Sequence, residues 1–205
     1  MEEIIVKFKK IPSTCAADAT DGLNSMDTAI KPLKEGYRVY GRAVTVKMPA
    51  GDNSAVLRAI RAAKPGEVLV IDSRGYISRA VAGDFVAGLA QILGLGGMVV
   101  DGSIRDVTGI GNSGFPVFCR SVTSSASTKN GGGEINVPIA CGGVAVNPGD
   151  IVVGDDDGVV IVPKEREQEI LLAAEKKLLK DQERAEVVLQ SPDAARDYLD
   201  KLLGS

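Results

Sequence analysis

The sequence of 205 residues predicts a mixed α/β fold, and we expect a single domain over residues 1–205. Up to about residue 115, short apolar runs alternate with amphipathic stretches, which is typical of strands connected by helices. Between residues 116 and 162, short valine-rich runs are separated by Gly, Asn and Asp, which is typical of strands and tight turns. A chain of this length buries roughly 70% of its unfolded surface, so its core needs neither a disulfide nor a metal.

The first elements are expected to be a helix, a strand and a second helix. Ser13 is placed to cap a helix over 14–23, because a side-chain oxygen at this position can accept from the first turn. The valines of 38–48 predict a strand. Asn53 is placed to cap the second helix, whose apolar residues fall on one face and which ends before Pro65.

The same alternation continues to about residue 110. The apolar runs 67–72 and 98–101 each end in an aspartate and predict buried strands. A helix is expected over 84–93, and the glycines of 94–97 predict a tight turn after it. A short helix is expected to begin at Arg105.

The remaining third is expected to hold strands and then helices. Four runs predict antiparallel strands, at 116–119, 135–140, 151–153 and 159–162. Pro163 is expected to open a long helix over 164–189, because proline is favoured at the first helical position. One side of this helix carries Ile170, Ala174, Leu178, Ala185 and Val188. Ser191 and Pro192 are expected to begin a last short helix.

Composition excludes several classes of function. Lys and Arg number 24 against 27 Asp and Glu, so the net charge of −3 has the wrong sign for neutralising a phosphate backbone, and we expect no direct nucleic-acid binding. Histidine is absent, which excludes Ser-His-Asp machinery and histidine-ligated zinc. The three cysteines lack Cys-x-x-Cys spacing and are expected to be reduced packing residues. With no signal-peptide pattern and no apolar run of membrane-spanning length, we expect a cytoplasmic protein without a membrane partner.

Three glycine-rich or acidic motifs are better explained as turns and loops. The run 109–114 has the spacing of a dinucleotide fingerprint, but a strand follows it where the fingerprint requires a helix, so we expect a turn. The run 155–158 lacks the alternating ligands of a calcium loop and is expected to be a solvated hairpin turn. The run 129–133 lacks the terminal Lys-Ser/Thr of a phosphate-binding loop and is expected to be a flexible loop.

Residues 83–106 carry the most informative pattern for chemistry. Gly83 and Asp84 open a helix whose free N–H groups suit a carboxylate or phosphate. Arg105 and Asp106 follow the next strand, and in α/β units the ends of neighbouring strands form the usual ligand crevice. Arg105 would then contact a keto or carboxylate oxygen, and Asp106 a hard divalent cation. The alternative is that Arg105 only forms a salt bridge with Asp84 or Asp106.

A resemblance to a known family rests on motifs spread over residues 13–185. They include 17–23, 64–72, the pair Gly83-Asp84, the run 101–106, the run 114–118 and the segment 146–159. Twenty residues separate Asp84 from Arg105, and Asp106 follows directly. With these motifs the sequence resembles the family of the regulator of ribonuclease E activity A (RraA) and the class II 4-hydroxy-4-methyl-2-oxoglutarate aldolases. The aldolase members share the spacing of Asp84, Arg105 and Asp106, whereas regulator-type members lack the second aspartate.

The resemblance implies a site for a 2-oxo acid and a divalent metal. Gly83, Asp84, Phe85 and Val86 would line it, with helix amides on the substrate carboxylate. Arg105 would contact the keto oxygen, Asp106 would bind the metal, and Asp84 would hold a water that shuttles a proton. An all-oxygen ligand set suits Mg²⁺ or Mn²⁺.

The resemblance further implies a layered β/β/α fold of the swivelling-domain type, in a homotrimer or a hexamer. Aldolase members place a glutamate from a neighbouring subunit near the site, and Asp181 stands roughly at that position here. The leading hypothesis is a metal-dependent lyase that cleaves 4-hydroxy-4-methyl-2-oxoglutarate-type acids to pyruvate, with oxaloacetate decarboxylase activity. The alternatives are a non-catalytic regulator that acts on ribonuclease E by protein binding, or a small-acid-binding protein without turnover.

Overall fold

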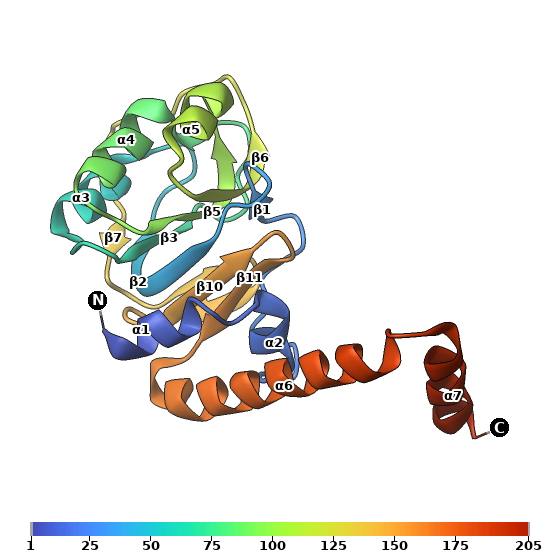
Figure 1. Ribbon diagram of the computed structural model, residues 1–205. Helices are drawn as coiled ribbons and strands as arrows, with labels where there is room; N and C mark the ends of the chain where they lie inside the picture. The colour runs from blue at the N-terminus through green and yellow to red at the C-terminus, as the bar shows by residue number, and fades with distance from the viewer. Residues whose placement is uncertain (1, 205) are drawn as a thin grey trace.

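A mixed sheet forms the body of the protein in the computed structural model, which describes residues 2–204 (Figure 1). Seven strands follow one another in the order β1-β6-β5-β3-β2-β10-β11, while β4 pairs with β5 and β7 with β2. A separate hairpin joins β8 and β9. The strands are β1 (Lys31–Pro32), β2 (Val39–Lys47), β3 (Val68–Asp72), β4 (Ala80–Ala82), β5 (Gly97–Ile104), β6 (Val117–Val122), β7 (Glu134–Ile135), β8 (Ile139–Cys141), β9 (Val144–Val146), β10 (Ile151–Asp155) and β11 (Gly158–Val162).

Helices flank the sheet on two sides, and three apolar clusters fill the layers. The helices are α1 (Glu3–Phe8), α2 (Ser13–Asp18), α3 (Ser54–Ala62), α4 (Asp84–Ile92), α5 (Val107–Ser113), α6 (Glu167–Val188) and α7 (Pro192–Leu203). One cluster lies between the sheet and α3, α4 and α5, and another between β10, β11 and the helices α1, α2 and α6 (Figure 1). The third joins β2, β3 and β5 to the β8–β9 hairpin. This arrangement confirms the expected layered α/β fold with a long C-terminal helix.

Parallel pairing brings the carboxyl ends of several strands to one edge. Strands β2, β3, β5 and β6 are parallel neighbours, and β4 lies parallel beside the end of β5. Ala82 pairs with Ile104, so the residues that follow both strands emerge side by side. The backbone N–H of Arg105 donates to the carbonyl of Ala82 (3.0 Å) and fixes that proximity.

The prediction that the side chains of Ser13 and Asn53 cap helices is wrong. Helix α2 begins at Ser13 itself and ends at Asp18, and the Ser13 hydroxyl and N–H both donate to Asp155 at the end of β10, so Ser13 caps no helix. Asn53 does occupy the N-cap position of α3, but its side chain makes no cap. Its amide nitrogen donates instead to the carbonyl of Val81 (3.1 Å).

Two other expectations in the middle of the chain are corrected. Strand β6 is parallel to β5, not antiparallel, because α5 carries the chain back to the start of the sheet. Residues 109–113 lie in α5 instead of a turn, and Gly114 ends the helix in a left-handed conformation. The hairpin turn at Asp155–Gly158 is confirmed, since β10 and β11 pair directly across it. The run 129–133 is confirmed as a loop.

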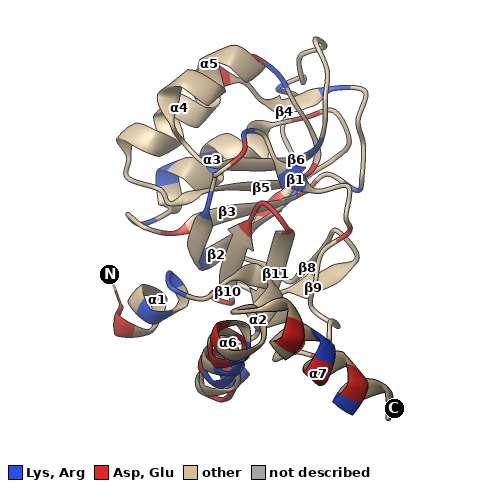
Figure 2. Cartoon of the chain, turned by 45° about the vertical axis from the view of Figure 1, so that its right-hand side comes forward, with Lys and Arg blue, Asp and Glu red and all other residues tan. Residues whose placement is uncertain are grey.

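The C-terminal helices extend away from the body (Figure 1). Helix α6 buries Ile170, Leu171 and Ala174 in its first half, whereas Ala185 in its second half is exposed. Charges of both signs alternate along α6 and α7 (Figure 2). Ser191 caps α7 as expected, with its hydroxyl accepting from the N–H of Ala194. Within residues 2–204, no helix combines the length and apolar character that crossing a bilayer requires.

The three cysteines are buried free thiols, as expected for packing residues. Burial raises the pKa of the Cys119 thiol to about 11. The pKa of Cys141 is raised further by burial and by the nearby carboxylates of Asp101 and Asp72. Both thiols therefore stay protonated and unreactive in the folded chain at neutral pH.

Candidate functional site

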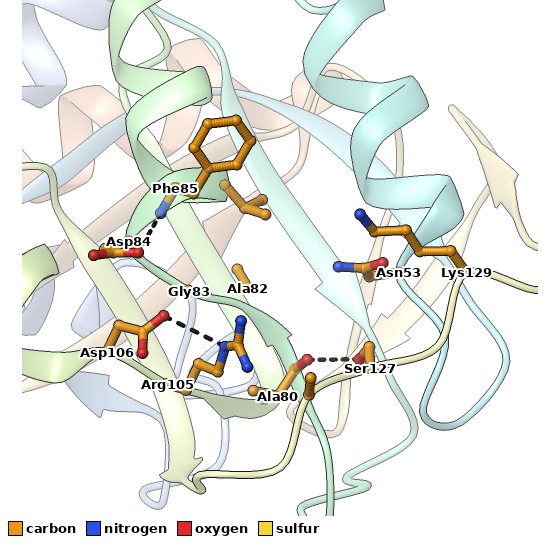
Figure 3. Close-up of a pocket in the computed structure, with 12 residues that line it drawn as sticks. Asn53, Ala80, Ala82, Gly83, Asp84, Phe85, Arg105, Asp106, Ser127 and Lys129 are labelled. Atoms are coloured by element: carbon orange, nitrogen blue, oxygen red, sulfur yellow. Dashed lines mark hydrogen bonds and ion pairs between the residues drawn. The ribbon is translucent and has the colours of Figure 1, made fainter.

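A cavity of about 290 Å³ lies where β4 and β5 end (Figure 3). Its volume is at the small end of the range for ligand pockets, roughly 300–1,000 Å³ for drug-sized ligands, and suits a small acid. The N-terminus of α4 and the turn after β5 form one wall, and the loop after β6, with Asn53 at the start of α3, forms the other. The structure brings all the candidate residues of the first wall together: Gly83, Asp84, Phe85, Val86, Arg105 and Asp106.

The first wall offers an anion site at the start of α4. Gly83 is the N-cap residue and Asp84 the first helical residue. The N–H groups of a first turn have no acceptor within the helix, and the helix dipole makes this end partly positive. One of them, the N–H of Phe85, donates to Oδ1 of Asp84 (2.6 Å). The carboxylate of Asp84 is thereby held on the same side of the site as Asp106 (Figure 3).

Arg105 and Asp106 form a loose ion pair beside this helix end. Nε of Arg105 lies 3.4 Å from Oδ2 of Asp106, and the two side chains are 42% and 40% exposed. The alternative weighed for Arg105, a salt bridge that clips the turn, is therefore present with Asp106. At this exposure and distance such a pair contributes little to stability, so both groups remain available to a ligand.

Asp106 is held in an unfavourable backbone conformation. Its φ of 58° and ψ of 43° are left-handed, which is uncommon for a residue other than glycine. It is the N-cap residue of α5, yet its side chain makes no capping hydrogen bond. Asp106 lines the cavity, and its Oδ2 lies near Nε of Arg105. Such strain of about 1–3 kcal/mol is concentrated at functional sites.

Two glycines allow the close approach of the acidic residues. A Cβ at Gly83 would lie 2.3 Å from Oδ2 of Asp106, although the extended backbone there would accept any residue. A Cβ at Gly109 would lie 2.8 Å from Oδ2 of Asp84. Gly109, the first glycine of the run 109–114, therefore lets α5 pack directly against Asp84.

The opposite wall holds polar residues that were not expected at a site. They are Asn53, Ser127 and Lys129. The sequence indicated only a helix cap at Asn53 and a flexible loop around Lys129. One sequence feature could have indicated this wall: the run 129–133 combines a lysine with three glycines, as anion-binding loops do, although no helix follows it.

Asp181 lies far from this cavity within one chain. It sits on α6, on the side of the molecule that carries α2. Its carboxylate is 3.3 Å from Nζ of Lys177 and 2.9 Å from a guanidinium nitrogen of Arg184. Any contact of Asp181 with a cavity requires a second copy of the chain.

The donors at the site fit a hard divalent cation in part. Asp84 and Asp106 supply carboxylate oxygens, and Mg²⁺ characteristically binds one or two carboxylates while waters and substrate oxygens complete its shell. Across the described part of the chain, no group of three or more His, Cys, Asp or Glu side chains is arranged to hold a metal. The site therefore suits a cation that is shared with a chelating ligand.

Comparison with known proteins decides the family. A model of the RraA-like family, described as Aldolase/RraA, matches residues 14–161. The chain belongs to the RraA-like family. A relative from Halalkalibacterium halodurans, named "Putative 4-hydroxy-4-methyl-2-oxoglutarate aldolase", is 49% identical over 98% of this chain and 96% of its own length.

Solved structures of the RraA-like fold agree with this chain. An uncharacterized protein from Pseudomonas syringae superimposes with a TM-score of 0.85 at 24% identity, covering 97% of this chain and 94% of that one. RraAS2 from Streptomyces coelicolor, described as an unusual member of the RNase ES inhibitor RraA family, gives a TM-score of 0.81 at 30% identity. That match covers 91% of this chain and 99% of RraAS2.

Proposed function

We propose that this RraA-like protein is a divalent-metal-dependent lyase that cleaves 4-hydroxy-4-methyl-2-oxoglutarate-type 2-oxo acids to pyruvate. The observation that carries the proposal is the meeting of Arg105 and two carboxylates at the N-terminus of α4. The aldolase name of the relative with 49% identity supports it. Oxaloacetate decarboxylation is proposed as a second activity of the same site, since it also leaves the enolate of pyruvate.

The substrate would be held by its 2-oxo acid end. Its carboxylate would accept from first-turn amides of α4, and the guanidinium of Arg105 would donate to the keto oxygen. As the C3–C4 bond breaks, its electron pair moves toward the C2 carbonyl, so negative charge grows on the oxygen that Arg105 contacts. An interaction that strengthens in this way lowers the barrier.

Asp106 would hold the cation, Mg²⁺ or Mn²⁺, with Asp84 close by. The cation would polarise the C2 carbonyl of a chelating 2-oxo acid. Asp84 would take the proton of the substrate hydroxyl through a water and return a proton to C3 of the leaving pyruvate. Its position beside Asp106 supports this role, as does the absence of a side chain at Gly109, where an added Cβ would lie 2.8 Å from Oδ2 of Asp84.

The test measures pyruvate release, coupled to lactate dehydrogenase, from oxaloacetate and from 4-hydroxy-4-methyl-2-oxoglutarate. Turnover with Mg²⁺ or Mn²⁺ should be lost with EDTA and in Asp106→Ala. Asp21→Ala is a matched control, because Asp21 is also a left-handed aspartate (φ 52°) but is exposed outside the cavity. Unchanged turnover in Asp106→Ala would refute the assignment.

We also propose that the chains assemble as trimers or hexamers in the cytoplasm and that Asp181 of one copy approaches the cavity of another. The side chain of Asp181 is 29% exposed, and most residues that follow it on α6 are exposed, so a second copy has access to this part of the helix. Light scattering after gel filtration gives the assembly mass. Asp181→Asn should lower kcat without changing that mass, and a kcat equal to that of the wild type would contradict the role.

A second function, regulation of a ribonuclease by protein binding, is favoured by the similarity to RraAS2. Purified protein should then slow cleavage of an RNA by a ribonuclease of the E type. Asp106→Ala should leave that effect intact, because regulation needs no chemistry at the cavity. Absence of binding and of inhibition would dismiss it.

A further inference from the structure

Strand β5 contains an extra residue shortly before it reaches the cavity. Three steps along β5, from Val100 to Ser103, match only two steps along the neighbouring strand β6. The extra residue falls at Asp101–Gly102 and forms a β-bulge, which is rare between parallel strands. Bulges are over-represented next to active sites, where they change the direction of the side chains that follow.

The bulge is also the point at which β5 changes its neighbour. Up to Asp101, β5 pairs with β3, and from Ser103 onward it pairs with β4 on that side. Strand β4 leads into Gly83 and the start of α4, while β5 leads into Arg105 and Asp106. Both parts of the first wall therefore depend on the segment that lies beyond the bulge.

Ser73 packs against the bulge and fits it closely. It follows β3, is fully buried, and its hydroxyl donates to the carbonyl of Asp101 (2.7 Å). The N–H of Gly75 donates to the same carbonyl (3.1 Å). A Cβ at Gly102 would clash with Oγ of Ser73, so the hydroxyl fills the space that the missing side chain leaves. This buried hydroxyl therefore holds the backbone and is not available as a nucleophile.

The carboxylate of Asp101 is anchored by two further donors. Nε of Arg120 lies 2.6 Å from Oδ1, and the N–H of Gly142 donates to Oδ2 (2.9 Å). Asp101 is only 7% exposed, and these donors compensate for the burial of its charge. With its carboxylate and its carbonyl both engaged, Asp101 holds the bulge in one position.

The charged groups of Arg105 and Asp106 depend on the backbone for their placement. Within residues 2–204 these two groups interact only with each other, at 3.4 Å (Figure 3). The backbone itself is tied down, since the hydroxyl of Ser103 donates to the carbonyl of Ile77 (2.8 Å) and the N–H of Arg105 to that of Ala82 (3.0 Å). A shift of the bulge would therefore move both charged groups.

We propose that Ser73 is a positioning residue for the candidate site. Its hydroxyl fixes the bulge, and the bulge sets where Arg105 and Asp106 lie relative to the first turn of α4. Ser73 is outside the lining of the cavity, so it acts on the site only through the backbone. The effect on turnover rests on the proposed function, whereas the effect on the geometry of the first wall does not.

The first test measures pyruvate release from oxaloacetate in Ser73→Ala. This substitution removes the hydroxyl and leaves the N–H of Gly75 on the carbonyl of Asp101. The value of kcat should fall about tenfold or more, because a small misplacement of reacting groups is costly. KM should rise by a smaller factor, since the contact of Arg105 with the keto oxygen strengthens in the transition state.

Thr45→Val is the matched control. It also removes one fully buried hydroxyl that donates to a backbone carbonyl, that of Val137 (2.6 Å), but it lies on β2 outside the cavity. Both variants should lower the urea midpoint, while only Ser73→Ala should lower kcat. The positioning role is refuted if both variants lower kcat by similar factors, or if Ser73→Ala keeps the kcat of the wild type.

Nuclear magnetic resonance tests the geometry without relying on activity. In isotope-labelled protein, the backbone amide signals of Arg105 and Asp106 should shift in Ser73→Ala and stay in place in Thr45→Val. If the wild-type protein releases no pyruvate, the proposed function has failed, and these signals alone decide the positioning role. Unchanged signals in Ser73→Ala would then overturn it.

Ser103→Ala provides a second variant if Ser73→Ala does not fold. It removes the hydrogen bond that ties the segment after the bulge to Ile77. If the bulge positions the site, this variant should also lower kcat relative to Thr45→Val. A kcat equal to that of Thr45→Val would contradict the role of the bulge.

Discussion

Replacing Asp106 by glycine or by alanine separates the stability of the site from its chemistry. Both substitutions remove the same carboxylate and the same exposed ion pair with Arg105, so those losses cancel when the two variants are compared. They differ in how easily the new residue adopts the backbone conformation of position 106, where φ is 58°. Alanine is strained in this left-handed region, whereas glycine adopts it freely.

The expected difference follows from two opposing effects. The left-handed conformation costs alanine about 1–2 kcal/mol, while glycine loses about 0.5–1 kcal/mol more backbone entropy on folding. Asp106→Gly should therefore be more stable than Asp106→Ala by about 1 kcal/mol. For a chain of this size, that difference raises the melting temperature by about 2–4 °C. Circular dichroism melts in EDTA measure it, so that bound metal does not contribute.

Both variants should lose metal-dependent pyruvate release, since neither can bind the cation. Asp21 provides the control: Asp21→Gly should also melt above Asp21→Ala, while both Asp21 variants keep full turnover. If the melting temperature of Asp106→Gly is equal to or below that of Asp106→Ala, the left-handed conformation at this residue does not strain the folded chain. Turnover in either Asp106 variant would refute its role as the metal ligand.

Three further predictions concern residues around the site and in the core. Gly109→Ala should lower kcat by about tenfold or more, because the new Cβ would displace the Asp84 carboxylate. Gly111→Ala is the control on the same helix, since the space around it is open; it should leave kcat unchanged and leave the free energy of unfolding unchanged or raise it by up to about 1 kcal/mol. Maleimide should modify Cys119 and Cys141 only when the chain unfolds. Modification of the folded protein within minutes, without denaturant, would contradict their burial. The pKa of Cys119 is raised by burial from 9.0 to about 11, so the unfolded state ionises first and stability should fall as pH rises from 9 to 11. Cys119→Ala should make the urea midpoint decline less over that interval, and an unchanged decline would show that this thiol is not responsible.

Elements with a strong local signal could be predicted from the sequence. The apolar runs that became β3 and β5 are buried along their whole length, and a run of this kind has few alternatives in an α/β chain. The start of α4 at Asp84 was also predicted, because a glycine precedes an amphipathic stretch there. These elements place Asp84 and Arg105, which is why one wall of the cavity was anticipated.

Elements that depend on distant partners could not be predicted in the same way. Strand β4 has only three residues and forms because β5 offers it an edge. The parallel direction of β6 depends on α5, and a segment with two internal glycines has low helix propensity. Helix α5 forms against α4, so tertiary packing outweighs local preference there.

The second wall escaped prediction for a related reason. Asn53 precedes a helix, where a capping role is the usual one, and its true partner at Val81 lies 28 positions away in the chain. Lys129 lies in a glycine-rich run, and the sequence of such a run does not indicate which cavity it borders. Contacts of Thr128 and Asn130 with Asn53 and Asp52, together with those of Ser125 and Ser127 with Ala80, bring this loop across from Arg105.

The central strand β2 has a consequence for the synthesis of this protein. One edge of β2 pairs with β3, which follows soon after it, but its other edge pairs with β10, which is made about a hundred residues later. At the usual pace of translation, that edge stays open for roughly 5–20 s while the chain grows. An open, apolar strand edge is a template for pairing between nascent chains. Slow translation or crowded polysomes should therefore favour aggregation of this protein before the ribosome reaches residue 155, and chaperones that bind extended segments should act in that interval.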